Sequence, residues 1–410
     1  MTIALPYTRG IVRANLLLLF LGTVLPLLSA DWPQWRGPNR DGHSTETGLL
    51  RSWPDGGPPQ VWKASGLGAG FASFAVADGR IYTQGQRDGR QYVMSFDLAT
   101  GEKLWETANG GSYSNSRGDG PRGAPTLDGG QIYAVSANGN LIAVEAATGK
   151  RLWSVDLLGR YGGSNIRWGL SESPLVDGNR VIVTPGGSKA GIVALNKTNG
   201  DEVWTSEPDR AGYSSFVVAR EGGVKQYITL TGTGGAGVRA DDGKVLWRYP
   251  KAGNRTANVA TPIVSGSHVF LSSDYGTGGA LLRLVPGGGA EEVYFTREMR
   301  NHYSSCVLVG GYLYGFSSRI FTALNFMTGE AVWKDRSVGK GQVIYAEGLL
   351  YVQSEDGIVG LVEPSPEAYK EISRFEVGRG SEPIWTLPVI ADGKLLLRDQ
   401  DTLYCFDIRR

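Results

Sequence analysis

The chain has 410 residues with a formal net charge of +1 at pH 7, and 20% of its residues are charged. This balance gives no global argument for a nucleic acid or an anionic membrane as partner, so we expect neither. Sixty glycines without a collagen period predict many tight turns.

The first thirty residues predict a cleaved secretory signal peptide. Arg9 and Arg13 precede an apolar run over residues 16–28, and "LSA" ending at Ala30 has the small residues of a cleavage site. The run is too short to span a bilayer comfortably. We therefore expect export to the periplasm or the cell exterior, with no transmembrane anchor after cleavage.

An eleven-residue motif recurs along the chain. Its copies read "SFDLATGEKLW", "AVEAATGKRLW", "ALNKTNGDEVW", "GVRADDGKVLW" and "ALNFMTGEAVW". The first four terminal tryptophans are 48, 51 and 43 residues apart. This period predicts degenerate copies at Tyr294 and Phe375 and one upstream at Trp62, which makes eight equivalent positions.

Asp-Gly or Gly-Gly turns followed by alternating apolar residues lie between these positions, as in "DGGQIYAVS" and "ADGKLLLRD". Such a pattern predicts hairpins of short strands. Four antiparallel strands in 40–50 residues are typical of a propeller blade. We predict an all-β chain, an eight-bladed propeller over residues 59–410, with seven blades or a rearranged closure as the alternative.

The two ends of the repeat array complement each other. The last unit stops after its third strand, and "PPQVWKA" near the N-terminus supplies a fourth. Pairing these segments would close the ring and remove two open sheet edges. Residues 31–58 are then expected to form an N-terminal extension that packs on the propeller.

The motif itself is predicted to be structural. Its glycine permits a positive φ in the turn, and its tryptophan buries a large apolar surface against a neighbouring blade. A phosphate-binding loop is excluded, because the Gly-x-x-x-x-Gly-Lys-Ser/Thr pattern is absent and no helix follows. These structural residues are Trp62, Gly101, Trp105, Gly149, Trp153, Gly200, Trp204, Gly243, Trp247, Gly329 and Trp333.

The motif A-x-[DEN]-x-x-[TN]-G-[KDE]-x-x-W resembles the tryptophan-docking motif of pyrroloquinoline quinone (PQQ) dehydrogenase propellers. It equally resembles the PQQ-like repeats of BamB, the outer-membrane assembly lipoprotein. The resemblance covers roughly residues 59–408 and is specific for the fold, not for activity. It implies two alternatives, a binding or scaffold module and a dehydrogenase with PQQ and Ca²⁺ as cofactors.

The enzymes of that family stack PQQ between a tryptophan and a vicinal disulfide, bind Ca²⁺ through Glu, Asn and Asp, and use an Asp base. In this chain Cys306 and Cys405 are not adjacent, and the repeat units are close to minimal length. The two cysteines fall in non-neighbouring units, too far apart to bridge. We predict two free, buried thiols.

Residues that occur once are expected to carry the function, and they gather in the loops that join one unit to the next. Seven such loops each contain an arginine. One interpretation is that most of these arginines are simply solvated. The alternative is that the loop residues line a central funnel for an anionic or polar ligand, with Trp168 as a stacking face. The predicted funnel residues are Arg122, Arg167, Trp168, Glu172, Arg210, Tyr213, Arg255, Asn258, Arg300, His302, Tyr303 and Trp385.

Catalytic and metal-binding candidates are few. His302 is the histidine best placed as a general base, and Asp274 is a second catalytic candidate. Glu172, Asn258 and Asp274 offer the hard oxygen ligands that Ca²⁺ prefers, although nothing in their spacing brings them together.

These residues are compatible with three functions. The first is an exported, monomeric, non-catalytic propeller that binds a protein, peptide or small polar ligand at the funnel. The second is the PQQ- and Ca²⁺-dependent dehydrogenase, and the third is a hydrolase or lyase that rests on His302 and scattered carboxylates. Minimal units and the lack of a dense acid–base cluster favour the first.

Overall fold

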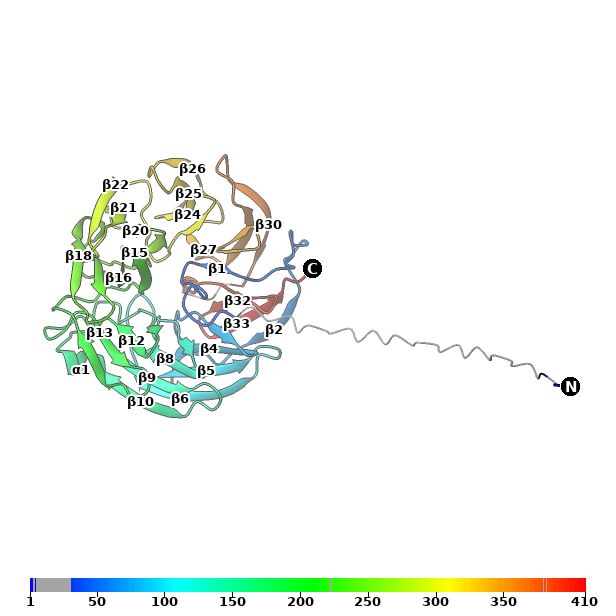
Figure 1. The fold of residues 1–410 in the computed structure, drawn as a ribbon, viewed down its shortest axis with the longest axis horizontal. Coiled ribbons are helices and arrows are strands. Elements are labelled where there is room, and N and C mark those ends of the chain that lie inside the picture. Colours follow the sequence, from blue (N-terminus) through cyan, green and yellow to red (C-terminus); the bar gives the residue numbers. More distant parts are fainter. Residues whose placement is uncertain (3, 5–30, 222, 379, 381) are drawn as a thin grey trace.

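Eight small antiparallel sheets form a closed ring in the computed structural model (Figure 1). The structure describes residues 1, 2, 4, 31–221, 223–378, 380 and 382–410. The predicted signal peptide therefore lies outside the described residues, apart from three positions at its start. Within the described part, no helix has the length and apolarity needed to cross a membrane.

The first four blades follow the chain in order. Each has its innermost strand first and its outermost strand last. Their strands are β3 (Ala75–Ala77), β4 (Arg80–Arg87), β5 (Arg90–Asp97) and β6 (Lys103–Gly111) in blade 1; β7 (Thr126–Asp128), β8 (Gln131–Val135), β9 (Asn140–Glu145) and β10 (Arg151–Asp156) in blade 2; β11 (Leu175–Asp177), β12 (Arg180–Val183), β13 (Val193–Asn196) and β14 (Glu202–Thr205) in blade 3; and β15 (Val217–Glu221), β16 (Val224–Thr231), β17 (Gly234–Arg239) and β18 (Val245–Tyr249) in blade 4.

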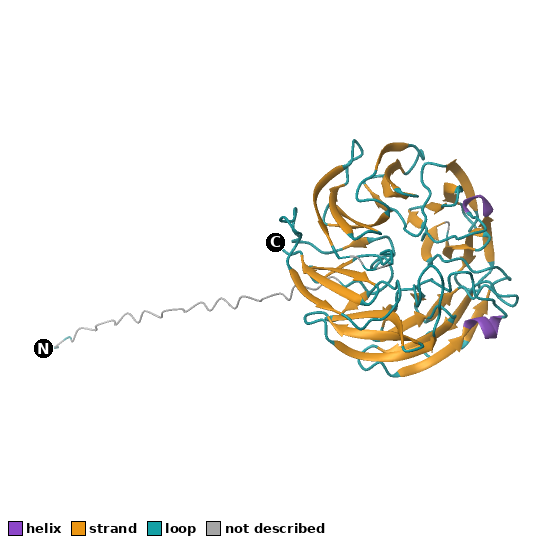
Figure 2. Cartoon of the chain, turned by 180° about the vertical axis from the view of Figure 1, so that it is seen from behind, coloured by secondary structure: helices purple, strands orange, loops and turns teal. Residues whose placement is uncertain are grey.

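The remaining blades continue round the ring. Two short helices, α1 (Leu157–Tyr161) and the 3₁₀ helix η1 (Pro250–Ala252), follow the outermost strands of blades 2 and 4 (Figure 2). The strands are β19 (Ile263–Ser265), β20 (His268–Ser273), β21 (Gly278–Leu284) and β22 (Ala290–Thr296) in blade 5; β23 (Val307–Val309), β24 (Tyr312–Ser317), β25 (Ile320–Asn325) and β26 (Ala331–Asp335) in blade 6; β27 (Gly341–Ala346), β28 (Leu349–Ser354), β29 (Ile358–Glu363) and β30 (Lys370–Glu376) in blade 7; and β31 (Val389–Ala391), β32 (Lys394–Asp399) and β33 (Thr402–Asp407) in blade 8.

The predicted closure is confirmed. Strand β2 (Gln60–Ala64) pairs antiparallel with β33 and completes blade 8, with Trp62 opposite Cys405. The first and last strands of the ring therefore lie side by side (Figure 1), and β2 covers the edge that β33 would otherwise leave open. Eight blades, rather than seven, is the observed number.

The motif tryptophans fasten each blade to the next. The Nε1–H of Trp153 in blade 2 donates to the Lys197 carbonyl oxygen of blade 3 at 2.9 Å, and its ring lies against Gly200 of the same turn. A Cβ at Gly149 would lie 2.5 Å from the Trp105 ring, so both the positive φ of 73° and the ring contact require glycine there. Equivalent indole-to-carbonyl bonds join Trp62 to Leu98, Trp105 to Ala146, Trp204 to Ala240 and Trp333 to Ser365.

The junction between blades 4 and 5 differs. The turn from β21 to β22 reads "VPGGGA" and lacks the motif, so no motif carbonyl faces Trp247. Trp247 donates instead to the Gln226 side chain of its own blade at 2.7 Å. Tyr294 replaces tryptophan at the next junction, where its hydroxyl donates to the Phe326 carbonyl at 2.9 Å and its ring contacts Gly329.

Both cysteines are free and buried, as predicted. Cys306 directly precedes the innermost strand of blade 6, and Cys405 lies in the third strand of blade 8. Burial raises the pKa of each thiol to about 12, so neither is a reactive thiolate near neutral pH.

Residues 31–44 run through the middle of the ring. Trp32 forms an antiparallel bridge with Val76 of blade 1, and β1 (His43–Ser44) adds to blade 7 as a fifth, parallel strand beside β27 (Figure 1). Two buried arginines bind backbone carbonyls between these ends: Arg40 donates to Ser173 and Pro174 of blade 3, and Arg36 to Cys306 of blade 6. This segment therefore ties distant blades together across the centre.

Candidate ligand-binding cavity

A cavity of about 620 Å³ lies at the centre of one face of the ring. Its walls come from the loops that join successive blades and from the turns between second and third strands. Antiparallel strands bring these two kinds of loop to the same face, while the turns that carry the motif glycines lie on the opposite face. We call these the loop face and the fastener face. A cavity of this size is in the range of small-molecule and peptide side-chain sites.

Residues 31–44 form the floor of the cavity. Trp35 lines it, and its indole Nε1–H donates to the Thr261 hydroxyl of blade 5 at 2.8 Å. Beneath it, burial lowers the pKa of Arg36 to about 10 and that of Arg40 to about 9. Both remain cations at neutral pH, and their bonds to carbonyls of opposite blades hold the floor in place.

Positive charge dominates the lining. Five cations and one carboxylate line the cavity, a formal excess of four positive charges. The carboxylate of Glu355 forms an ion pair with Lys340 at 2.9 Å and accepts a hydrogen bond from Trp385 Nε1–H at 2.6 Å. The remaining cations are Arg117, Arg122, Arg167 and Arg319.

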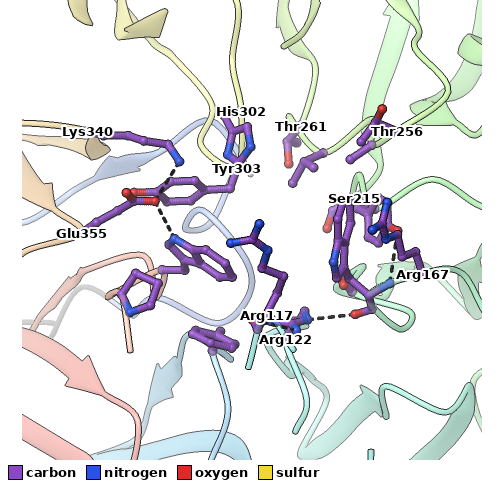
Figure 3. Close-up of a pocket in the computed structure, with 18 of the residues that line it drawn as sticks. Arg117, Arg122, Arg167, Ser215, Thr256, Thr261, His302, Tyr303, Lys340 and Glu355 are labelled. Atoms are coloured by element: carbon purple, nitrogen blue, oxygen red, sulfur yellow. Dashed lines mark hydrogen bonds and ion pairs between the residues drawn. The ribbon is translucent and has the colours of Figure 1, made fainter. Parts of the chain in front are cut away.

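Arg117, Arg167 and Arg319 are exposed at the cavity and are not paired with a carboxylate. Among the described residues, no Asp or Glu oxygen lies within 4 Å of any of their guanidinium groups. Figure 3 shows Arg117 reaching between two walls, with Tyr303, Lys340 and Glu355 on one side and Arg167 and Ser215 on the other. These side chains retain their hydrogen-bonding capacity for a ligand.

Arg122 has a different role, because the protein itself binds it. Its Nε donates to the Trp168 carbonyl at 2.9 Å and its Nη2 to the Gly118 carbonyl at 2.8 Å, while the guanidinium lies 4.7 Å from the centre of the Phe71 ring. Burial lowers its pKa, Asp119 nearby opposes this shift, and no described carboxylate forms an ion pair with it. Arg122 thus adds a fixed positive charge to the cavity wall.

Aromatic rings form two groups on the walls. Trp385 lies 4.9 Å from Phe71 and 5.8 Å from Tyr303, measured between ring centres. A second pair, Trp168 and Tyr213, has ring centres 5.7 Å apart. The Arg167 guanidinium lies 5.1 Å from the Trp168 ring. Flat apolar surface and cationic charge are therefore adjacent on the walls.

Two polar groups of the wall have unused bonding capacity. His302 shares a hydrogen bond of 3.0 Å between its Nε2 and the Tyr275 hydroxyl, whereas its buried Nδ1 has no partner in the described structure. Burial, and then Lys340, lower the pKa of His302, which is therefore neutral at pH 7. The buried Tyr303 hydroxyl also has no partner there, and burial raises its pKa well above the usual value.

The structure brings together more than half of the predicted funnel residues. Seven line the cavity: Arg122, Arg167, Trp168, Tyr213, His302, Tyr303 and Trp385. Five predicted residues do not line it: Glu172, Arg210, Arg255, Asn258 and Arg300. Arg210 and Arg255 are exposed elsewhere on the loops, and the backbone of Arg300 is held by Ser317 and Ser318.

The three Ca²⁺ candidates are committed to other bonds. Glu172 is buried and accepts the Thr184 N–H at 2.5 Å, and its pKa is raised to about 7 by burial. Asn258 is buried, accepting the Asn254 N–H and donating to the Thr231 carbonyl. Asp274 accepts the Ser318 hydroxyl, and none of the three lines the cavity.

The lining does not fit a Ca²⁺ site. Its carboxylate is already paired, and five cations would repel a divalent ion. No group of three or more His, Cys, Asp or Glu side chains among the described residues is arranged to hold a metal. The cavity therefore has a cationic, aromatic wall in place of the expected Ca²⁺ ligand set.

Several lining residues were not singled out from the sequence. Arg117, Lys340 and Pro383 lie in connecting loops, and that loop position is the sequence feature that could have identified them as lining residues. Tyr275, Arg319 and Glu355 lie in turns between second and third strands, which reach the same face because strands alternate in direction. Trp35 and Phe71 precede the first blade, and only the closed ring places them at its centre.

Fold and repeats define the class of protein: an eight-bladed β-propeller of the PQQ-like repeat type. A profile of the family described as outer membrane protein assembly factor BamB matches residues 54–161 and 89–335, more than half of the chain. The chain belongs to this family.

Curated relatives are similar to parts of the chain. It is 31% identical over 216 residues to the BamB of Kangiella koreensis, which is 50% of this chain and 48% of that protein. It is 26% identical over 287 residues to the BamB of Yersinia pestis, covering 63% of this chain and 67% of that one. Tetrathionate hydrolase of Acidithiobacillus ferrooxidans is 25% identical over 297 residues, 69% of this chain and 50% of that enzyme. The chain thus spans about half the length of the Kangiella koreensis and Acidithiobacillus ferrooxidans relatives.

Solved structures share the fold. BamB from Moraxella catarrhalis superposes with a TM-score of 0.62 at 16% identity, covering 85% of this chain and 99% of that one. Quinohemoprotein alcohol dehydrogenase from Comamonas testosteroni gives 0.66 at 13% identity, covering 92% and 80%. At these identities the likeness establishes the fold alone.

Proposed function

We propose that the protein is an exported, non-catalytic propeller that binds a segment of a partner protein in the central cavity of its loop face. The observation that carries this proposal is the cavity wall, in which unpaired arginines and aromatic rings face a common space. Such a wall provides binding groups, because arginine and aromatic side chains dominate the energetics of protein recognition.

Relatives support the protein-binding part of the proposal. The matching family and two relatives carry the description of an assembly factor for outer membrane proteins. Assembly factors act by contact with other proteins, and a rigid ring with a non-repeating loop face suits that task. The sequence of residues 1–30 adds the prediction of export.

The wall offers little for catalysis. Its histidine is neutral and bonded to Tyr275, and its carboxylate is paired with Lys340. Glu355 is held by Lys340 and Trp385, so it is not available as a second acid–base group beside His302, whose Nδ1 has no partner in the described structure. This arrangement favours binding over hydrolysis or lyase chemistry.

A selection from a displayed peptide library on the immobilised mature protein tests the proposal. Thr256 lines the cavity and is exposed, whereas its neighbour Arg255 is exposed and does not line it. We expect Thr256→Trp, which fills the mouth, to weaken enriched peptides at least tenfold. Arg255→Trp, which places the same indole beside the cavity, should alter their affinity less than twofold. Absence of enriched peptides, or equal binding to both variants, would refute the proposed function.

PQQ binding is the second candidate, because a cationic and aromatic wall also suits a flat polyanion. Adding PQQ with and without Ca²⁺ to the mature protein and following its melting temperature decides the matter. A cofactor bound at micromolar affinity raises the melting temperature at saturation. A rise with PQQ would favour the quinoprotein alternative, and no rise would exclude it.

A further inference from the structure

We infer that the cavity selects an acidic peptide segment with an aromatic residue next to its carboxylates. This inference rests on the proposed function and adds the chemistry of the bound segment. It starts from the balance of hydrogen-bond donors and acceptors on the wall. Arginine side chains have donors only, and Glu355, which would accept, already receives bonds from Lys340 and Trp385.

The donors that remain belong to Arg117, Arg167 and Arg319. Each comes from a different blade junction or turn, so a ligand at the centre is approached from separate directions. Each presents a planar fork that matches a carboxylate in two parallel bonds. A neutral peptide backbone would leave most of these donors unused, whereas clustered Asp or Glu side chains would satisfy them.

Fixed charge adds to this selectivity. The Arg122 guanidinium is held by backbone carbonyls, lies largely out of solvent and forms no ion pair with a described carboxylate, so Asp119 nearby offsets its positive field only in part. The buried Arg36 and Arg40 lie in the segment that forms the floor, and are also bound mainly to carbonyls. Positive charge behind a concave, partly apolar wall focuses the potential into the cavity and attracts anions.

The aromatic rings of the wall explain why the bound segment should contain an aromatic residue beside its carboxylates. The pair of Trp168 and Tyr213 lies beside Arg167. The pair of Trp385 and Phe71 lies beside Arg122, and both pairs offer apolar faces. An aromatic side chain in the segment would pack on one of these faces at separations of about 4.5–7 Å between ring centres. Its neighbouring carboxylates would then reach the guanidinium groups.

The test compares two peptides, acetyl-Glu-Glu-Tyr-Glu-Glu-amide and its Gln-Gln-Tyr-Gln-Gln counterpart, by titration calorimetry on the full mature protein. We expect the glutamine peptide to bind at least tenfold more weakly, and the glutamate peptide to weaken steeply between 50 and 200 mM salt. Equal affinity for the two peptides would overturn the inference.

Matched double variants separate local recognition from net charge. Arg117→Gln with Arg319→Gln removes two cavity arginines, and Arg210→Gln with Arg255→Gln removes two loop arginines outside the cavity. The first pair should lower affinity for the glutamate peptide at least tenfold, and the second less than twofold. Equal losses would mean long-range attraction alone and would also overturn the inference.

Two further outcomes keep this inference distinct from the proposed function. Tighter binding of an acidic oligosaccharide, with oligogalacturonate as the probe, would replace the peptide by a glycan. Failure of both peptides, alongside enriched library peptides that Thr256→Trp weakens, would refute the acidic preference and leave the protein-binding function standing.

Discussion

The fastener face and the loop face of the propeller come from the same blades but follow opposite rules. On the fastener face one short motif is repeated, and each tryptophan meets a glycine and a carbonyl of the next blade. On the loop face nothing repeats, and side chains from loops all round the ring meet at one cavity. Repetition marks the contacts that hold the ring together, and its absence marks the surface that is free to bind. The predictions below test that division.

The largest effect is expected on the fastener face. Trp153→Ala removes a ring that is 9% exposed and its bond to the Lys197 carbonyl. We expect the free energy of unfolding to fall by about 3–5 kcal/mol, the usual cost of truncating a buried tryptophan. Urea denaturation measures it. Peptide affinity of the folded variant should stay within twofold, and a loss of affinity without a loss of stability would contradict the division.

A buried carboxyl behind the cavity should give the next largest effect. Burial raises the pKa of Glu172 to about 7, above its ordinary value of 4.5, so the folded state holds the proton more tightly. Its contribution to stability is complete below pH 4.5 and is lost as the pH rises through 7. Glu172→Gln should remove this dependence and gain on the order of 3 kcal/mol over the natural protein at pH 8. Parallel pH–stability curves for the two proteins would show that Glu172 titrates normally.

Alanine substitutions at two glycines distinguish the stability cost of backbone strain from the cost of crowding the tryptophan ring. Gly149 and Gly79 have φ values of 73° and 70°, but a Cβ would meet Trp105 at Gly149 and open space at Gly79. Gly79→Ala should cost about 1 kcal/mol from the backbone alone, and Gly149→Ala about 1–2 kcal/mol more. Thermal or urea unfolding of the pair measures the difference. Equal costs would mean that the fastener contact contributes little.

The smallest effect on stability is expected on the loop face. Trp168 is half-buried and packs beside Tyr213 and Arg167 at the cavity. Trp168→Ala should change the free energy of unfolding by less than about 1 kcal/mol, while weakening cavity-bound peptides at least fivefold. Calorimetry and denaturation on the same sample test both parts. Unchanged peptide affinity would remove Trp168 from the binding site.

The fold was predictable because its information is local and repeated. Each motif combines a turn glycine with a docking tryptophan at a fixed spacing, and this spacing identified Tyr294 as an equivalent of tryptophan. The prediction for Phe375 was wrong by two residues, because the register of β30 puts Ser373 at the tryptophan position, although the Phe375 ring still contacts Gly57 of the closing blade. The closure by residues 60–64 followed from the missing strand of the last unit. The changed partner of Trp247 was not predicted, because it depends on a turn of the neighbouring blade.

The cavity was predictable only in part. Loop position identified Arg122, Arg167, Trp168 and His302, since residues that break a repeat gather on one face. The same rule also selected Glu172 and Asn258, which do not line the cavity and are bonded to backbone groups instead. A loop sequence does not show which side chains point inward, and that choice depends on hydrogen bonds made after folding.

The sequence by itself determined the repeat, the number of blades, the strand that closes the ring and the free state of Cys306 and Cys405. These properties depend on periodicity and on residue types at fixed spacing. Only the tertiary structure decided which cations remain unpaired, and that residues 31–44 cross the centre to put Trp35 on the cavity floor. Those properties depend on contacts between segments up to about three hundred residues apart, such as that between Phe71 and Trp385. A closed ring brings such segments together at one point, because every blade contributes to the same centre.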